Sequence, residues 1–438
     1  MKPQKTYNNQ AEIFRNSLSN QLKPGHELMI LAKTIRWNEI EEEFSDMHTN
    51  SWKGGQPPKP VRLMVGLLLL EYMHDLSDEN VVRMWVENPY WQYFCGYDFL
   101  QWEFPIDPSS LTRWRKRLGK ERVEKMLGLT VKCALDIGVV ARKDLEDVIV
   151  DTTVMPKNVS YPTDSKLMNR SRERLVTLSK KHGVDLRQNY NLIMKKLTRQ
   201  IGGYLHAKQM KRAKAAIKKL KTYCGRVVRD IERKISTDVV LQEIFKNELQ
   251  KAHKILTQEK HGKNKIYSIH EPHVECIAKG KAHKRYEFGC KASFVMTHKK
   301  GKSLVLSSEA KHGNPHDSRT LKDALVLTEK TTGIKPINAF VDLGYRGHDV
   351  DDTKVWFSRQ KRGVTEKFRK HIKRRQAIEP HLGHMKNEGK LDRCRLWGEV
   401  GDQLHAALVG AGYNLRLILN YLRIFLAQIL IVLFGVTA

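Results

Sequence analysis

The chain has 438 residues, of which 40% are apolar, so it is long enough for two or three domains with hydrophobic cores of their own. Its formal net charge is +30 at pH 7. Charge of one sign repels itself in a compact state, and so large an excess indicates a polyanionic partner. The six Cys include no C-x-x-C pair, so neither a zinc site nor a disulfide framework is predicted, which fits a reducing cytoplasm. The N-terminus lacks the apolar segment of a signal peptide, and none is expected.

Residues 1–55 are interpreted as an N-terminal segment that ends at a break, G-G-Q-P-P at residues 54–58. A helical domain is predicted for residues 56–140. It begins with the strongly apolar stretch from Val61 to Met73, which indicates a buried helix. Ser77 is a candidate N-cap for the helix that follows.

A short basic helix is predicted later in this domain, where Ser109 can cap the start and Gly119 can end the helix. A basic helix after another helix is typical of helix-turn-helix binding to DNA, because its cations contact phosphates. A solvated basic face explains the pattern equally well. The candidate DNA-binding residues are Arg113, Arg115, Lys116 and Arg117.

An apolar strand is predicted at Val148, Ile149 and Val150, and it runs into Asp151. The strand therefore has a carboxylate near its end.

Residues 165–260 differ from the rest of the chain in charge. They show long helical periodicity and contain about 25 Lys and Arg against about 8 Asp and Glu, so they hold more than half of the net charge. The densest part runs from Lys211 to Lys221. We interpret the segment as an inserted helical arm whose basic faces contact a phosphate backbone.

Short strands are predicted after the arm at residues 265–268, 286–296 and 303–309, and their spacing indicates an antiparallel meander. A helix is predicted from residues 314–318 to about Thr328, with Asp317 or Ser318 as its cap. Residues 355–357 (V-W-F) are a further predicted strand.

Residues 336–347 (P-I-N-A-F-V-D-L-G-Y-R-G) alternate with period two between a Pro and two Gly. They predict a short, mostly buried strand with Asp342 at its C-terminal end. A buried carboxylate is costly unless its charge is compensated, and Mg²⁺ is one compensator because it prefers hard oxygen ligands. Taken alone, Asp342 is more simply explained as a cap of the next turn. A metal site needs further carboxylates.

The third candidate carboxylate is Glu379. Apolar residues at helical spacing predict a buried stripe that consists of Ile378, Leu382 and Met385. Beside that stripe, Arg375, Glu379 and Lys386 share one line of the helix. On an isolated helix this line would be a surface ladder of ion pairs. With two strand-borne Asp residues elsewhere in the chain, Glu379 becomes a candidate third ligand.

The C-terminal residues 415–438 are apolar, but Arg416, Asn420, Arg423 and Gln428 interrupt them at helical spacing. The pattern predicts an amphipathic helix that closes a core and not a membrane span.

In this order and spacing, the motifs identify a resemblance to the DDE transposases of bacterial insertion sequences, in the IS-five group. The matching motifs are V-D-T-T at 150–153, A-F-V-D-L-G-Y-R-G at 339–347, and R-x3-E-x6-K, formed by Arg375, Glu379 and Lys386. Residues 76–96 and 401–416 also resemble that group. The likeness covers roughly residues 55–425. One departure is Ile372, which stands where the family has a Tyr.

The resemblance implies an α/β fold with an RNase H-like mixed sheet flanked by helices, built from residues 141–164 and 261–425. It implies that Asp151, Asp342 and Glu379 are catalytic and bind two Mg²⁺ ions, with Mn²⁺ as a substitute. It also implies that Arg375 and Lys386 hold DNA phosphates and that Tyr345 and Arg346 contact DNA near the cleaved end. The expected partners are double-stranded DNA, both element ends and target, and further copies of the chain on that DNA.

Two other functions remain open from the sequence. One is a metal-dependent nuclease of the same fold that cuts without joining, and the other is an inactive DNA-binding relic. In all three cases the expected location is the bacterial cytoplasm, at the nucleoid, without a membrane partner.

Overall fold

The computed structural model describes residues 16–45, 58–259, 262, 264–278, 285–360 and 362–434. The predictions for residues 1–15, for most of the break at 54–58 and for residues 435–438 lie outside this part of the chain. The chain divides into two compact units, one made of residues 1–156 and 290–438 and the other of residues 157–289.

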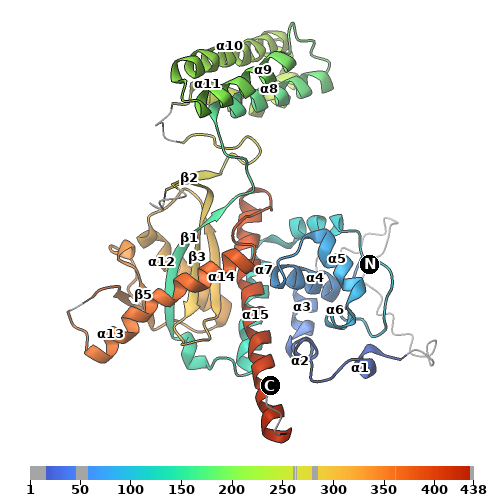
Figure 1. Ribbon diagram of the computed structural model, residues 1–438, viewed down its shortest axis with the longest axis vertical. Helices are drawn as coiled ribbons and strands as arrows, with labels where there is room; N and C mark the ends of the chain where they lie inside the picture. Colours follow the sequence, from blue (N-terminus) through green and yellow to red (C-terminus); the bar gives the residue numbers. More distant parts are fainter. Residues whose placement is uncertain are drawn as a thin grey trace. The chain divides into compact units, whose positions relative to one another are not determined.

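A mixed β-sheet lies in the first unit (Figure 1). Its strands are β1 (Asp147–Pro156), β3 (Glu287–Thr297, which begins in the second unit), β4 (Val305–Lys311), β5 (Asn338–Val341) and β6 (Lys354–Phe357). Their order is β4-β3-β1-β5-β6. Strands β3 and β4 are antiparallel, whereas β5 is parallel to β1 and to β6. The amide of His298, just after β3, donates to the carbonyl of Asp147 at the start of β1, so these two strands are antiparallel. The predicted mixed α/β class is confirmed.

Five predicted strands are confirmed as β1, β3, β4, β5 and β6, with β3 and β4 in the expected antiparallel pair. The strand predicted at residues 265–268 is wrong. Ile266 and Ile269 are buried in a core of the second unit, and the Ile266 amide donates to the side chain of Gln258 instead of to a strand. Apolar alternation over so few residues therefore reflected packing against helices.

The N-terminal part of the first unit is helical, as predicted. Its helices are α1 (Leu18–Gln21), α2 (Glu27–Thr34), α3 (Trp37–Glu43), α4 (Val61–Met73), α5 (Asp78–Glu87), α6 (Pro89–Phe94) and α7 (Ser109–Asp136). Helix α4 is buried on almost all sides, and the Ser77 side chain caps α5 by accepting from the Asn80 amide. Gly119 breaks the basic helix, as predicted, because its φ of 70° and ψ of 167° are not helical. Helix α7 therefore consists of two helical segments that meet in a kink at Gly119, and apolar residues of the second segment, such as Val123 and Leu127, are buried.

Short helices connect the strands of the sheet. Between β4 and β5 lie η3 (Asp317–Thr320) and α12 (Leu321–Thr332), and η4 (Leu343–Tyr345) follows β5. After β6 come α13 (Glu366–Lys373), η5 (Arg374–Ala377) and α14 (Ile378–Glu388). The cap predicted at Asp317 or Ser318 is instead His316, whose ring nitrogen accepts from the Ser318 amide. The apolar stripe of α14 is confirmed, because Ile378, Leu382 and Met385 are all buried.

Helix α15 (Gly398–Phe434) packs against α4, α7 and β4, and so joins the helical region to the sheet (Figure 1). It begins well before the predicted start at residue 415, because Leu404, Leu408 and Leu415 are buried. Asn420, Arg423 and Gln428 of the predicted polar face are exposed. In the described part of the chain, no helix is long and apolar enough to cross a membrane.

The second unit contains the predicted basic insertion. It consists of α8 (Asp164–Lys181), α9 (Asn191–His206), α10 (Met210–Ile235), α11 (Val239–Thr257) and β2 (Glu275–Ile277), which pairs antiparallel with residues 287–289 of β3. Two apolar clusters, around Leu220 and around Phe245, hold the helices together. At the base of the unit the Lys157 amide donates to the Phe288 carbonyl at 2.8 Å.

Candidate active site

Asp151 lies in β1, and Asp342 directly follows the parallel partner strand β5. The paired residues run from Asp147 opposite Asn338 to Ile149 opposite Phe340, and the same register continued two residues further would set Asp151 opposite Asp342. Partners in a parallel pair point to the same face, and adjacent strands lie about 4.8 Å apart. Asp342 directly follows β5, as predicted, but it is exposed and not buried as expected, because β5 ends at Val341. Asp151 does not lie near a strand end, because β1 continues to Pro156. The β-branched Thr152 and Thr153 extend the strand, and both are buried.

Arg375 connects Asp151 to Glu379. Its Nη2 lies 2.9 Å from a carboxylate oxygen of Asp151, and its Nη1 lies 3.6 Å from a carboxylate oxygen of Glu379. The Arg375 side chain is only 7% exposed, whereas that of Glu379 is 67% exposed. Arg375 is in η5 and Glu379 in the first turn of α14, so the buried stripe of α14 fixes both against the sheet. The helical line predicted for this pair is confirmed.

Asp342 is held in its ionised form. Partial burial opposes ionisation, but the hydrogen bond from the Ser358 hydroxyl and the nearby charges of Arg375 and Arg359 lower the pKa of Asp342. The Ser358 Oγ donates to the Asp342 carboxylate at 2.7 Å. The charge of Arg375 therefore acts on all three candidate carboxylates.

The three carboxylates do not form a closed cluster. Asp151, Asp342 and Glu379 do not have one oxygen each within 4.8 Å of one another. The structure thus places Asp151 and Asp342 on paired strands and links Glu379 to Asp151 through the guanidinium of Arg375, while Glu379 stays largely in solvent.

A fourth acidic residue, Asp317, lies beside this group, although the sequence predicts for it only the role of a helix cap. The Asp317 carboxylate accepts from the Thr152 hydroxyl at 2.9 Å and pairs with Lys291 Nζ at 3.1 Å. Thr152 directly follows Asp151 in β1, and Lys291 is in β3. Asp317 therefore ties η3 to the two strands at the level of Asp151. Its only sequence signal is the run N-P-H-D-S, which is typical of any helix start.

The predicted DNA contacts around the site have different surroundings. Arg346 is exposed and Lys386 half-buried, which leaves both predictions open. Tyr345 is 1% exposed, so the prediction that it contacts DNA is corrected: it is a core residue of η4. Burial, together with the charges of Asp151 and Asp317, raises its pKa well above the usual range. Ile372, at the family's Tyr position, is also buried.

In the basic part of α7, Arg113, Lys116 and Arg117 are exposed and can reach a phosphate backbone. Arg115 cannot, because it is 6% exposed and forms ion pairs with Glu71 and Asp78. The prediction that Arg115 binds DNA is therefore corrected: its ion pairs connect α7 to α4 and α5 within the helical region. The sequence pattern could not distinguish Arg115 from the other three cations, because its acidic partners come from other helices.

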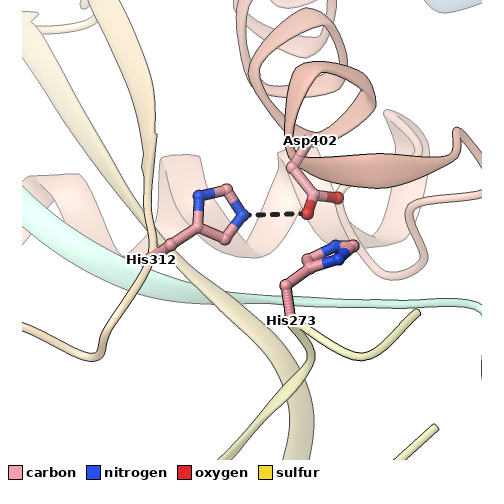
Figure 2. Close-up of side chains that lie close together, drawn as sticks. All are labelled: His273, His312 and Asp402. Atoms are coloured by element: carbon pink, nitrogen blue, oxygen red, sulfur yellow. Dashed lines mark hydrogen bonds and ion pairs between the residues drawn. The ribbon is translucent and has the colours of Figure 1, made fainter. Parts of the chain in front are cut away.

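Asp402, near the start of α15, is almost fully buried and accepts a hydrogen bond from His312, which follows β4 (Figure 2). The distance from His312 Nε2 to the Asp402 oxygen is 3.1 Å. This pair lies outside the group around Arg375. It fixes the start of α15 beside the end of β4.

Comparison with known proteins gives matches at both ends of the sequence. Residues 16–117 match a family described as "Transposase domain (DUF772)", and residues 351–419 match a "Transposase DDE domain". The second match contains Arg375, Glu379 and Lys386, whereas Asp151 and Asp342 lie outside both matched regions.

A Rhizobium meliloti protein described as "Uncharacterized protein ORF8 in nfe locus" is 43% identical over 209 residues, which are 48% of this chain and all of that protein. No solved structure matches the chain. DDE transposases use a divalent metal and act on DNA. The chain therefore contains a transposase domain at residues 16–117 and a transposase DDE domain at residues 351–419.

Proposed function

We propose that the chain binds the terminal inverted repeats of a mobile DNA element, cuts the DNA there and joins the ends to target DNA, with Asp151, Asp342 and Glu379 as its catalytic carboxylates. The observation that carries the proposal is the position of Arg375, which forms ion pairs with Asp151 and Glu379. The parallel pairing of β1 with β5, the strand that Asp342 follows, supports it. Two acidic side chains on adjacent strands repel each other, and they persist where cations compensate them.

The donor set fits a hard divalent cation. Mg²⁺ takes carboxylate oxygens and keeps several waters, and it is bound through few carboxylates in phosphoryl-transfer sites. Asp151 in β1 and Asp342 after the paired strand β5 would supply two ligand oxygens, and the exposed Glu379 would supply a third. When bound, two such ions would activate the attacking oxygen and stabilise the leaving one in an in-line displacement. Mn²⁺, with the same ligand preference, is the expected substitute.

The chain's own residues prepare these carboxylates. Ser358 and Arg375 keep Asp342 ionised at neutral pH, because both lower its pKa. Arg375 restrains Asp151 and Glu379 by its ion pairs, and Asp317 braces β1 one residue further along through Thr152. Pre-positioned charges need little reorganisation during the reaction, which is the main source of electrostatic catalysis.

The strand arrangement supports an RNase H-like core. Three antiparallel strands, β4, β3 and β1, continue into the parallel strands β5 and β6, which is the mixed sheet expected from the resemblance to the IS-five group. The exposed cations Arg113, Lys116 and Arg117, with the basic helices of the second unit, supply the charge for DNA. Assembly of further copies on the DNA belongs to the same proposal.

The experiment uses DNA from both sides of the coding sequence, which should contain the terminal repeats. The purified full chain is incubated with labelled end DNA, a target plasmid and Mg²⁺, and products are separated on denaturing and native gels. Cleavage and joined products are expected from the wild type and neither from Asp342→Asn, which keeps the size of the side chain but removes its charge and one ligand oxygen. Cleavage without joined products would identify a nuclease, and binding without cleavage would identify an inactive relic.

A further inference from the structure

A basic cleft of about 740 Å³ opens beside η5 in the first unit. One wall is the turn between β3 and β4, with Lys299 and Lys300, and the other consists of α13 and η5, with Lys370, Lys373 and Arg374. The lining contains no carboxylate. We call it the η5 cleft. None of its five cations belongs to the DNA-binding residues predicted from the sequence.

The two walls of the η5 cleft are fixed to each other. The Nε2 of His298, which precedes Lys299, donates to the backbone carbonyl of His371 at 2.9 Å. Burial lowers the pKa of His298 to about 4, so its ring is neutral at pH 7 and adds no charge to the cleft. The His298 ring also stacks on Phe340 of β5, with the ring centroids 4.3 Å apart. The spacing of the cations is thus set by the sheet and not by loose side chains alone.

Most of the positive charge in the η5 cleft is uncompensated. Lys299 pairs with Asp144. In the described part of the chain, Lys300, Lys370, Lys373 and Arg374 form no ion pair within 4.0 Å. Four cations that converge on one cavity repel one another, and the repulsion is relieved by an anion in the cavity.

Arg374 supplies an independent sign of a missing acceptor. Its Nη2 is shielded from solvent and has no hydrogen-bond acceptor among the described residues. A shielded donor without an acceptor costs about 1–3 kcal/mol, more when the donor is charged. Arg375, the next residue, forms ion pairs through its two terminal nitrogens with Asp151 and Glu379. Of these two adjacent residues, Arg375 pairs with the carboxylates and Arg374 lines the η5 cleft.

We propose that the η5 cleft binds the phosphate backbone of double-stranded DNA and guides a strand toward the carboxylates; the identity of the polyanion rests on the proposed function. Planar guanidinium groups match phosphate geometry in a bidentate way, and lysines add charge. The cations extend over α13, η5 and the β3–β4 turn, which suits an extended polymer better than one small anion. Such contacts position DNA without reading its sequence.

The test compares two triple variants of the full chain. The cleft variant carries Lys370→Gln, Lys373→Gln and Arg374→Gln. The control carries Lys33→Gln, Lys322→Gln and Lys335→Gln, three exposed lysines of the same unit, two of them next to carboxylates. Both variants lose the same charge. Affinity is measured by fluorescence anisotropy as a function of salt, in EDTA so that no cleavage can occur, on a random-sequence duplex and on a duplex with the terminal repeat.

The cleft variant should lose the same affinity on both duplexes, and the slope of log affinity against log salt should fall by about 0.9 for each phosphate contact removed. Equal losses in the cleft and control variants would overturn the proposal, as would a loss confined to the repeat duplex. A second measurement needs no substitution: DNA should protect Lys300, Lys370 and Lys373 of the wild type from acetylation and leave Lys33, Lys322 and Lys335 reactive. Unprotected cleft lysines would also overturn it. Because neither readout needs catalysis, an inactive chain leaves the inference testable.

Discussion

The Nη2 of Arg375 lies 2.9 Å from the carboxylate of Asp151, although β1 and η5 lie at opposite ends of the sheet-forming part of the sequence. The same guanidinium lies 3.6 Å from Glu379. Partial burial raises the pKa of Asp342, and the Ser358 hydrogen bond and the charge of Arg375 together lower it below its usual value. One cation thus connects the three carboxylates of the proposed site.

Arg375→Gln should reduce the cleavage rate by about 10–100-fold, the usual effect of losing a residue that orients metal ligands. The pKa of Asp342 should rise, because one of the charges that lowers it is gone, so the acid limb of the pH–rate profile should move to higher pH. Arg359→Gln is the matched control, since Arg359 also lowers the pKa of Asp342 but more weakly. Identical pH profiles for the two variants would show that Arg375 does not set the pKa of Asp342 more strongly than Arg359 does.

Glu379→Gln should abolish both cleavage and joining, whereas Glu388→Gln and Glu366→Gln should keep most activity. Glu379 lies in the first turn of α14 and contacts Arg375. Glu388 ends the same helix and pairs with His384, and Glu366 starts α13. A Mg²⁺ ligand tolerates little drift, so its position on a packed helix is decisive. The assay is end-DNA cleavage in Mg²⁺ after circular dichroism of each variant. Normal cutting by Glu379→Gln would disprove the assignment of the third ligand.

The basic face of α10 should contribute to DNA affinity. Ala213, Ala216 and Leu220 face the core of the second unit, and the six cations between residues 211 and 221 are exposed. Replacing those six cations by Gln should lower the salt slope of binding by about 0.9 for each one that contacts a phosphate. The control replaces Lys246 and Lys251 of α11, which are paired with carboxylates. A salt slope that stays at the wild-type value would place the face against solvent or protein.

Glu71→Gln should destabilise the first unit by about 3–5 kcal/mol, the usual cost of removing one partner of a buried ion pair. Glu71 is buried and accepts from Arg115 at 2.8 Å and from Lys390 at 2.5 Å. Its loss removes the carboxylate partner of Lys390 and leaves Arg115 paired with Asp78 alone. Urea unfolding measures the change. The comparison variant is Glu87→Gln, whose exposed pair with Arg83 should contribute less than about 1 kcal/mol. Similar unfolding midpoints for the Glu71 and Glu87 variants would show that the ion pairs of Glu71 are not part of the cooperative core.

The parts of the site that were predictable from sequence are those set by local pattern. The alternation around Asp342 predicted β5, and the stripe beside Glu379 predicted α14, because burial on one face leaves a period in the sequence. Asp317 was not predictable as a neighbour of Asp151, because its partners Thr152 and Lys291 come from two distant strands. The burial of Arg115 depended in the same way on acidic residues of α4 and α5.

The backbone hydrogen bond from Lys157 to Phe288 joins the two ends of the segment that forms the second unit. The unit leaves at the end of β1 and returns at the start of β3, which are antiparallel neighbours that a tight turn can join. All of residues 157–289 therefore occupy the position of a hairpin loop. Lengthening or exchange of such a loop costs the host little, because the entropy of closing a loop grows only slowly with its length. The basic helices are thus a replaceable module, which a lineage can enlarge, swap or lose while the register of the catalytic strands stays the same.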